Sequence, residues 1–268
     1  MNIVTPKIEL IASTQLANTP EGGPKIEDWM SLDPSATDGE SLVEFAGRGC
    51  YESWSRPNPK TAHNADYIRR TAFDMQHGSI LEHASATFRF SGVSRAWLME
   101  MERHRHLSWS VVSQRYVDAN TFGAVMPPAL REVPTDLAQD DWEQATIRDL
   151  NSYNYFVSLL EADGVPRKQA REAARSVLPN CTEVRGVVTG NLRAWSTILP
   201  LRAHPSADRE MQEVSMLILD ALEPVAPTVA RHIKEQIAYG EMSEERPDRE
   251  AVLARRKRIG ELRNKEHA

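Results

Sequence analysis

Hydrophobic and polar residues alternate in short runs along several parts of the chain, and this alternation predicts strands. In the segment SATFRFSGVS, Ala86, Phe88 and Phe90 fall on one side and polar residues on the other, which is the period of a strand with one buried face. Residues 1–14 are expected to form an edge strand, and residues 181–191 are expected to form another β segment. The pattern therefore predicts three strands.

Other parts of the chain repeat their hydrophobic residues at helical spacing. Residues 38–53 are one such segment, and Asp38 or Ser41 is the expected N-terminal cap. Residues 65–78 are a second, ended by Gly78, because glycine adopts the left-handed conformation common just after a helix. Further helices are expected over residues 95–106, 136–164, 166–177, 191–203 and 207–236. Helices and strands are intermixed without an internal repeat or a clear linker, so the sequence predicts one mixed α+β domain over residues 1–240.

The last segment of the chain differs in composition from the rest. Residues 241–268 are highly charged and mix Glu with Arg, which is typical of a solvated helical tail. The RRKR run at 255–258 also allows a nucleic-acid-binding arm, but neighbouring acidic residues offset its charge. The tail is therefore expected to be a solvent-exposed helix, with the arm as the weaker interpretation.

Composition narrows the class of protein. The 268 residues carry a net charge of -6, so no overall basic character favours nucleic acid as a partner. The two cysteines, Cys50 and Cys181, form neither a disulfide framework nor a zinc-binding pattern, which favours a reducing compartment and no metal. The N-terminus lacks the pattern of a signal peptide, and no run approaches the roughly 20 apolar residues that cross a bilayer. We expect a cytoplasmic protein with no membrane partner.

One short stretch concentrates cations and hydroxyls, the segment RHRHLSWSVVSQRY at 103–116. On a helix, Arg103 and Arg105 would point about 200° apart and could not bind one small anion. If the chain leaves the helix here, they can serve two ligands or two parts of one. Ser113 and Arg115 would share a face on an extended segment, and a hydroxyl beside a guanidinium makes a good phosphate clamp.

The alternative for this stretch is a basic surface helix balanced by Glu100 and Glu102. A longer pattern argues against it. An Arg-His-Arg followed by seven residues and a Ser resembles the signature of the flavin-dependent thymidylate synthases, and further segments resemble that family in order and spacing over roughly residues 40–235. These segments are GRGCYESWSRPNP at 47–59, HGSILEHASATF at 77–88, SRAWLMEMERHR at 94–105, ARSVLPNCTEVRGVVTGNLRAW at 174–195 and LRAHPSADREMQ at 201–212.

The resemblance implies a fold and a reaction. Such enzymes pack helices on a mostly antiparallel sheet and form homotetramers whose active sites lie between subunits. NADPH reduces their bound FAD, and the methylene group of methylenetetrahydrofolate is transferred to C5 of dUMP. No enzyme cysteine attacks the uracil, so Cys50 and Cys181 are expected to be small packing residues.

The resemblance also implies roles for individual residues. The expected cofactor-binding residues are Ser79, Arg103, His104, Arg105, Asn191, Arg193 and Thr197, and the expected nucleotide-binding residues are Arg95, Glu100, Arg103, Val111, Ser113, Gln114, Arg115, Arg175 and Arg202. Arg202 matches the family arginine placed against the uracil ring, where a fixed guanidinium stabilises the negative charge that develops on N3 and O4. It is the expected catalytic residue. The alternative role for Arg175, Arg193 and Arg202 is in surface salt bridges.

Three departures from the family pattern involve four positions. Val111 stands where many members have Glu or Gln, Thr197 and Ile198 replace a His-Phe or Asn-Phe pair, and Ser206 replaces a frequent His. One interpretation is drift that leaves dUMP as substrate. The other is a changed ribose site, giving C5 methylation of UMP, or of both nucleotides, as in relatives from nucleoside-antibiotic pathways. A non-catalytic flavin- or nucleotide-binding protein, a nucleic-acid-binding module and a thymidylate synthase with a cysteine nucleophile are further alternatives.

Overall fold

A four-stranded antiparallel sheet forms the centre of the molecule. The computed structural model describes residues 1–17, 24–26, 33–54, 58–132 and 136–242. The strand order is β2 (Lys7–Ser13), β3 (Ser85–Ser94), β6 (Glu183–Asn191) and β4 (Leu107–Val111), and every neighbouring pair is antiparallel. The two short strands β1 (Ile3–Val4) and β5 (Ala124–Val125) pair in parallel. The predicted α+β class with a mostly antiparallel sheet is confirmed.

The predicted alternation along β3 is confirmed. Ala86, Phe88 and Phe90 are each at most 1% exposed, and Trp195 packs edge-on against Phe88 with 5.3 Å between ring centroids. The intervening residue Arg89 is exposed. One face of the sheet therefore forms the main hydrophobic core.

Glycines let the edge strand β4 approach β6 closely. A Cβ on Gly186 would lie 2.3 Å from the Ser110 carbonyl oxygen, and one on Gly190 would lie 2.6 Å from a Leu107 methyl carbon. Any larger residue would therefore push the strands apart. These two positions fix both ends of β4, because Leu107 pairs with Gly190 and Val111 pairs with Gly186.

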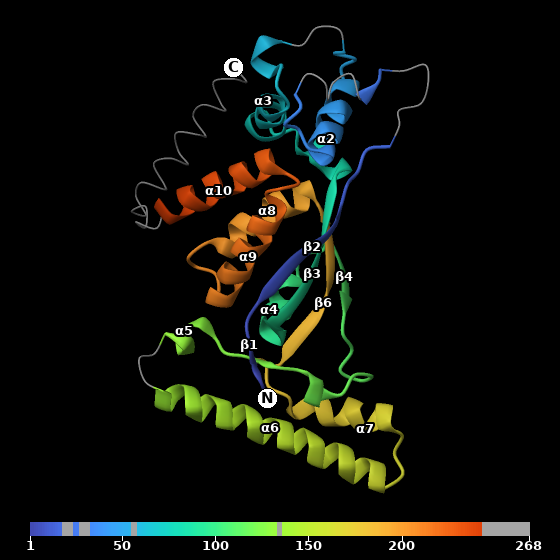
Figure 1. The fold of residues 1–268 in the computed structure, drawn as a ribbon, viewed down its shortest axis with the longest axis vertical. Coiled ribbons are helices and arrows are strands. Elements are labelled where there is room, and N and C mark those ends of the chain that lie inside the picture. Colours follow the sequence, from blue (N-terminus) through green and yellow to red (C-terminus); the bar gives the residue numbers. More distant parts are fainter. Residues whose placement is uncertain (18–23, 27–32, 55–57, 133–135, 243–268) are drawn as a thin grey trace, which may run out of the picture.

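The helices form two groups, one above and beside the sheet and the other below it in the view of Figure 1. The first group comprises α2 (Asp38–Gly49), α3 (Asn64–Ile68), α8 (Leu192–Ala203), α9 (Arg209–Leu222) and α10 (Pro227–Met242), together with the short turns η1 (Pro59–Thr61), η2 (Arg69–Asp74) and η3 (Gly78–His83). The second comprises α5 (Pro128–Arg131), α6 (Asp136–Ala162), α7 (Arg167–Ala174), η4 (Ala119–Thr121) and η5 (Arg175–Val177). Between them, α4 (Arg95–Met101) follows β3 directly. A smaller core of Ala119, Phe122, Tyr153 and Ala174 lies beneath α6 and α7.

Several predicted helix boundaries are wrong. Residues 207–236 form two helices, α9 and α10, because Pro224 lies in the connection and proline disfavours continued helix. The helix predicted over 95–106 ends at Met101. The helix predicted to end at Gly78 ends earlier, where Gln76 takes the left-handed φ of 61°.

The cap of α2 also differs from the prediction. The Thr37 hydroxyl, and not Asp38 or Ser41, accepts from the Glu40 amide at 3.3 Å. Asp38 instead accepts from the Leu16 amide at 3.0 Å, which ties the segment after β2 to the helix.

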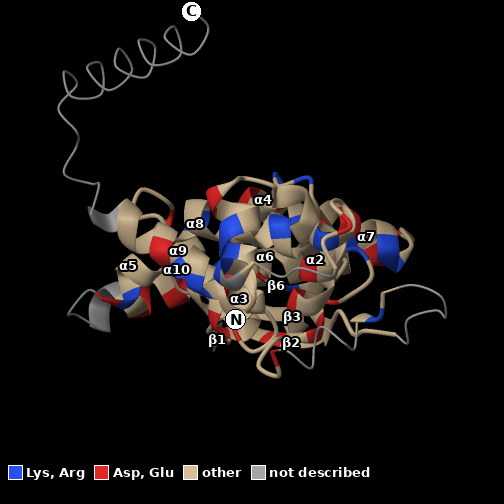
Figure 2. Cartoon of the chain, turned by 90° about the horizontal axis from the view of Figure 1, so that it is seen from above, with Lys and Arg blue, Asp and Glu red and all other residues tan. Residues whose placement is uncertain are grey.

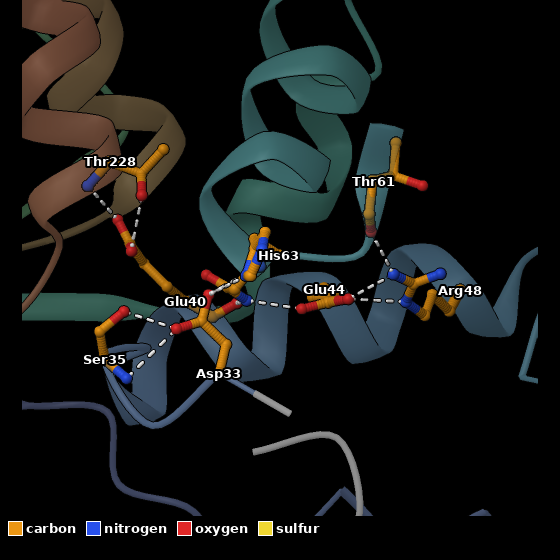
Figure 3. A network of polar contacts seen from close by, with 9 residues as sticks. Asp33, Ser35, Glu40, Glu44, Arg48, Thr61, His63 and Thr228 are labelled. Atoms are coloured by element: carbon orange, nitrogen blue, oxygen red, sulfur yellow. Dashed lines mark hydrogen bonds and ion pairs between the residues drawn. The ribbon is translucent and has the colours of Figure 1, made fainter. Parts of the chain in front are cut away.

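A polar network fastens α2 to the rest of its helix group (Figure 3). The buried Glu40 carboxylate accepts from the Thr228 amide at 2.7 Å and hydroxyl at 2.9 Å, at the start of α10. Burial raises the pKa of Glu40, and the bonds from Thr228 only partly oppose this. Further along α2, buried Arg48 donates to Glu44 at 2.7 Å and to the Thr61 carbonyl at 2.8 Å. The network holds the C-terminal end of α2, which lines a cavity described below.

Charges are mixed over the surface of the described residues. Figure 2 shows basic and acidic residues interspersed along the helices, α7 included. None of the helices in the described part of the chain is long and apolar enough to cross a membrane. The expected domain boundary at 240 falls within α10, and all but the first two residues of the predicted tail, 241–268, lie outside the described residues.

Candidate functional site

The Arg-His-Arg stretch lies in a turn between α4 and β4. The chain leaves the helix after Met101, and the His104 amide donates to the Met101 carbonyl at 3.1 Å. Arg103 and Arg105 are exposed, whereas His104 is half-buried. The condition for the two arginines to face different ligands, departure from the helix, is therefore met.

Arg202 is held between His104 and Glu100, and we call these three residues the Arg202 cluster. Arg202 Nε donates to His104 Nε2 at 2.8 Å, and its two terminal nitrogens donate to the Glu100 carboxylate at 2.9 Å and carbonyl at 3.1 Å. The Arg202 side chain is 18% exposed. Burial, followed by the positive charges of Arg202 and Arg103, lowers the pKa of His104. Neutral His104 can accept the bond from Arg202, so the guanidinium has one fixed orientation.

The start of α8 provides the wall of a cavity of about 430 Å³. Asn191 caps the helix by accepting from the Ala194 amide at 2.8 Å, and Thr197 donates to the Arg193 carbonyl at 2.9 Å. Arg193 also forms an ion pair with Glu82. The lining residues are Glu82, His104, His106, Asn191, Arg193, Ala194, Thr197 and Ile198. Four expected cofactor residues, His104, Asn191, Arg193 and Thr197, are thus brought together.

A second cavity, of about 420 Å³, opens on the other side of Arg193. Ser79 lies in it on η3 and is exposed, and Cys50 and Tyr51 approach from the end of α2. A Cβ on Gly78 would lie 3.4 Å from Arg193 Nε, so the absence of a side chain there leaves room for the guanidinium. Arg193 therefore belongs to both cavities and links the expected contact Ser79 to the other cofactor residues.

The remaining expected nucleotide residues follow the far end of β4. Ser113 and Arg115 would share a face on an extended segment, but the chain is not extended here. The Ser113 carbonyl accepts from the Tyr116 amide at 3.2 Å and from the Val117 amide at 2.9 Å, which closes a turn. Within it, the Arg115 amide donates to the Ser113 hydroxyl at 3.3 Å. We call residues 113–118 the β4 turn. A tight turn can also bring the Ser113 hydroxyl and the Arg115 guanidinium close together. It does so because the backbone folds back, and not because side chains alternate along a strand.

Helix α7 packs beside the β4 turn. Arg115 forms an ion pair with Glu172 at 3.7 Å. Gln114 is 6% exposed, and its Nε2 has no partner among the described residues. The half-buried Arg175 begins η5 directly after α7. Four expected nucleotide residues thus occur at this end of β4, and the half-buried Arg95 occurs at the start of α4.

Within one chain, the expected residues fall into two groups at opposite ends of β4. From Leu107, next to the Arg202 cluster, to Ser113 is six residues, or about 20 Å of extended chain. Val111 is the last residue of β4, two residues before Ser113, and it packs against the main core with Trp109.

Sequence reasoning assigned no role to two lining residues, Glu82 and His106. Glu82 stands inside the quoted segment HGSILEHASATF, and its charge is the signal that could have identified it as a partner for an arginine. His106 stands next to the Arg-His-Arg signature. Its contribution depends on the turn that brings it to α8, which hydrophobic periodicity does not reveal.

Comparison with known proteins identifies the family. Residues 34–228 match the family model described as thymidylate synthase complementing protein. A probable flavin-dependent thymidylate synthase of Mycobacterium phage D29 is 45% identical over 242 residues, covering 87% of this chain and 99% of the phage protein. A flavin-dependent thymidylate synthase of Mycolicibacterium gilvum is 44% identical over 230 residues, covering 83% and 88%.

Two solved structures share the fold. Thymidylate synthase X from Helicobacter pylori, solved with FAD and dUMP, aligns with a TM-score of 0.57 at 20% identity, covering 87% of this chain and 99% of that one. A UMP/dUMP methylase from Streptomyces cacaoi, bound with 5-Br dUMP, aligns with a TM-score of 0.62 at 23% identity, covering 88% and 97%. The sequence matches establish more than the fold: the chain belongs to the flavin-dependent thymidylate synthase family.

Proposed function

We propose that this protein is an enzyme that methylates C5 of dUMP to give dTMP, with methylenetetrahydrofolate as the carbon donor and FAD reduced by NADPH. The observation that carries the proposal is Arg202, fixed by His104 and Glu100 in a chain whose close relatives are named flavin-dependent thymidylate synthases. Retention of this arginine with three bonds favours catalysis over a protein that only binds flavin or nucleotide.

The Arg202 cluster suits the charge that forms during C5 substitution. Addition to the uracil ring places negative charge on N3 and O4, and a guanidinium that is already oriented stabilises that charge without reorganising. The bonds from Arg202 to His104 and Glu100 supply the orientation. Arg202 is accordingly the proposed catalytic residue, and Glu100 is proposed to hold it.

The residues around the two linked cavities fit FAD. A dinucleotide carries a diphosphate, which requires donors and positive charge along an extended site. Arg193 supplies a guanidinium to both cavities, and Ser79 and Asn191 supply polar contacts on either side. We propose that these residues hold FAD with His104, Thr197 and the exposed Arg103 and Arg105. When bound, FAD supplies the reducing equivalents for the transferred carbon.

The β4 turn is proposed to bind the nucleotide phosphate through Ser113, Gln114 and Arg115, together with Arg175. Its separation from the Arg202 cluster, about 20 Å along β4, supports a homotetramer whose active sites lie between subunits, because one chain alone does not join the two groups. The mass of the purified protein in solution tests this assembly. Two free cysteines, Cys50 and Cys181, support the cytoplasm as the compartment.

UMP is the second candidate substrate. It is favoured by the departures at Val111, Thr197 and Ser206, and by the shared fold of a protein described as a UMP/dUMP methylase. Against it, Val111 packs on the main core, so its apolar side chain has a packing role. Ser206 contacts the His204 ring at 2.7 Å on an exposed turn. These contacts support drift and favour dUMP.

The test is the mass of the product. The protein is incubated with FAD, NADPH and methylenetetrahydrofolate, and with dUMP or UMP in parallel reactions. Methylation of dUMP alone supports the proposal, and methylation of UMP establishes the alternative. Bound flavin with no methylated product from either nucleotide would overturn both in favour of a binding protein. Reactions without methylenetetrahydrofolate serve as the control for the carbon source.

A further inference from the structure

One face of α7 is directed at the β4 turn. Lys168, Arg171, Glu172 and Arg175 are spaced three, four and seven residues apart from the first, and such positions lie on one side of a helix. The first three of these contact the β4 turn. The fourth, Arg175, is already among the residues proposed to bind the nucleotide. The face therefore joins the turn to a further phosphate-binding candidate.

Arg171 makes the strongest of these contacts. Its Nη1 donates to the Tyr116 carbonyl at 2.7 Å, and its Nη2 donates to the Asp118 carboxylate at 2.8 Å. The Arg171 side chain is only 14% exposed. Hydrogen bonds that involve an ionised group are stronger than those between neutral groups. Arg171 makes two such bonds and thereby holds two residues of the turn at once.

Asp118 transmits this clamp to the end of the turn. Its carboxylate also accepts from the Asn120 amide at 2.9 Å and side chain at 2.7 Å. Burial acts to raise the pKa of Asp118, but the bonds from Asn120 and Arg171 outweigh it, and the pKa lies below its ordinary value. Asp118 is therefore ionised at neutral pH and available to Arg171.

The neighbouring contacts are weaker. The Lys168 ammonium lies 5.0 Å from the centroid of the Tyr116 ring, and Tyr116 is exposed. The Arg115–Glu172 pair spans 3.7 Å with side chains 43% and 49% exposed, and exposed pairs of this kind contribute little. A nucleotide phosphate can compete with Glu172 for Arg115 without disturbing the Arg171 clamp.

We infer that Arg171 is a positioning residue for nucleotide binding, which fixes the β4 turn on α7 so that Ser113 and Arg115 face the phosphate. This inference rests on the proposed function of the turn. Arg171 acts through Tyr116 and Asp118, so its loss should loosen the turn and weaken the nucleotide while leaving the Arg202 cluster and the flavin residues unchanged.

The test compares Arg171→Gln with Arg167→Gln in the full chain. Arg167 is a matched control because it lies four residues earlier on α7, is exposed, and makes its hydrogen bond and ion pair with Glu161, while only the longer-range charge of Asp118 also acts on it. Hydrogen–deuterium exchange of the amides in 113–120 reports the turn without any ligand. Steady-state kinetics and flavin titration then give the nucleotide KM, kcat and the FAD affinity.

In Arg171→Gln, we expect faster exchange over 113–120 and a nucleotide KM raised about tenfold, the effect of losing one to two charge-assisted hydrogen bonds. FAD affinity should stay unchanged and kcat nearly so. Arg171→Lys, which retains one charged donor, should recover part of the KM. Arg167→Gln should match the wild type in each measurement.

Unchanged exchange over 113–120 in Arg171→Gln would overturn the inference, as would equal effects of the two variants. A parallel loss of FAD and nucleotide binding would also overturn it, since it indicates a general role in folding. If the wild type binds neither dUMP nor UMP, the proposed function fails, and the exchange contrast alone then shows whether Arg171 orders the turn.

Discussion

The two ends of β4 carry the two parts of the proposed site, and they are built differently. At one end, Arg202 is 18% exposed and its guanidinium makes three hydrogen bonds to Glu100 and His104. At the other, Arg115 is 43% exposed and has one ion pair, to Glu172 at 3.7 Å. The group proposed to stabilise charge during the reaction is fixed in advance, whereas the group proposed to bind phosphate can exchange its partner.

The hydrophobic packing that supports the two ends of β4 also differs, and the end with the more fixed arginine has the larger core. The Arg202 cluster stands on α4 and α8, whose residues Met101 and Leu199 are fully buried in the main core. The β4 turn stands on the smaller core, which includes Phe122 and Tyr153. Segments with fewer buried apolar contacts open at lower free energy. The proposed catalytic arginine therefore lies on the larger core, and the turn on the smaller core is the one that we infer to be held by Arg171.

The largest effect is expected from Arg202→Ala. Removing a preorganised donor to a developing anion lowers kcat by about a hundredfold or more, while FAD should stay bound because the Arg193 contacts remain. Single-turnover methylation of dUMP and the flavin spectrum of the purified variant measure the two effects. The difference between the two ends of β4 predicts that KM changes far less than kcat.

The matched control for this variant is Arg209→Ala. Arg209 has the same charge, lies at the start of the next helix, α9, and forms an exposed ion pair with Glu132 at the end of α5. It should turn over at the wild-type rate. Wild-type turnover in Arg202→Ala itself would remove the catalytic role of Arg202 and with it the contrast drawn here.

The second largest effect is expected from Arg115→Ala. Loss of a guanidinium from the proposed phosphate site should raise the nucleotide KM by about 10- to 100-fold, and kcat should fall much less. Initial rates over a range of dUMP concentration separate the two parameters. Arg148→Ala, which removes an exposed arginine from α6, should leave KM as it is. A fall in kcat at constant KM in Arg115→Ala would place Arg115 in the chemical step.

Local periodicity predicted the elements well, and the contacts between them poorly. Phe88 and Phe90 identify β3 because burial on one face imposes a period of two. The prediction of a single helix over 207–236 is wrong because the helical spacing of hydrophobic residues continues past Pro224, whereas the helical backbone is interrupted there. The bond from Arg202 to His104 joins residues 98 positions apart. Such a contact depends on how α8 packs against the turn after α4, which no local pattern encodes.

The family signature reached further into the site than periodicity did, but it also has a limit. It selected residues at both ends of β4 without showing that one chain keeps them apart. The matched segment at 174–195 contains Arg175 but not Arg171, whose proposed role depends on the Tyr116 carbonyl and the Asp118 carboxylate. A bond to a backbone carbonyl can form with any residue type, so a sequence motif does not identify it.

A smaller effect is expected in the pH dependence of stability. Burial, then Arg202 and Arg103, lowers the pKa of His104 below the ordinary 6.5. As pH falls through about 6.5, the unfolded chain binds a proton that the folded chain does not, so this contribution to stability is lost at acid pH. His104→Gln keeps an acceptor for Arg202 but cannot titrate. The wild type should therefore lose free energy of unfolding, relative to this variant, between about pH 7 and pH 5.5.

Urea unfolding at several pH values measures this difference. Because Arg202 is one cause of the lowered pKa, Arg202→Ala should also raise the pKa of His104 in an NMR titration. A parallel pH dependence of the wild type and His104→Gln would show that His104 is not held neutral, and that the Arg202 cluster is less fixed than its geometry indicates.

The smallest effect is expected from the cysteines, neither of which is an expected site residue. Burial raises the pKa of the Cys181 thiol to about 11, so Cys181 is protonated at neutral pH, and a thiol attacks carbon far more slowly than a thiolate. Cys50 is exposed at the edge of the second cavity, on the side of Arg193 away from the Arg202 cluster, so the expectation that it is a packing residue is wrong. We expect Cys50→Ala and Cys181→Ala to methylate dUMP at close to the wild-type rate. Loss of turnover in a folded, flavin-bound variant would instead indicate a cysteine nucleophile. The proposed mechanism, in which Arg202 stabilises the uracil charge without attack by an enzyme cysteine, would then be wrong.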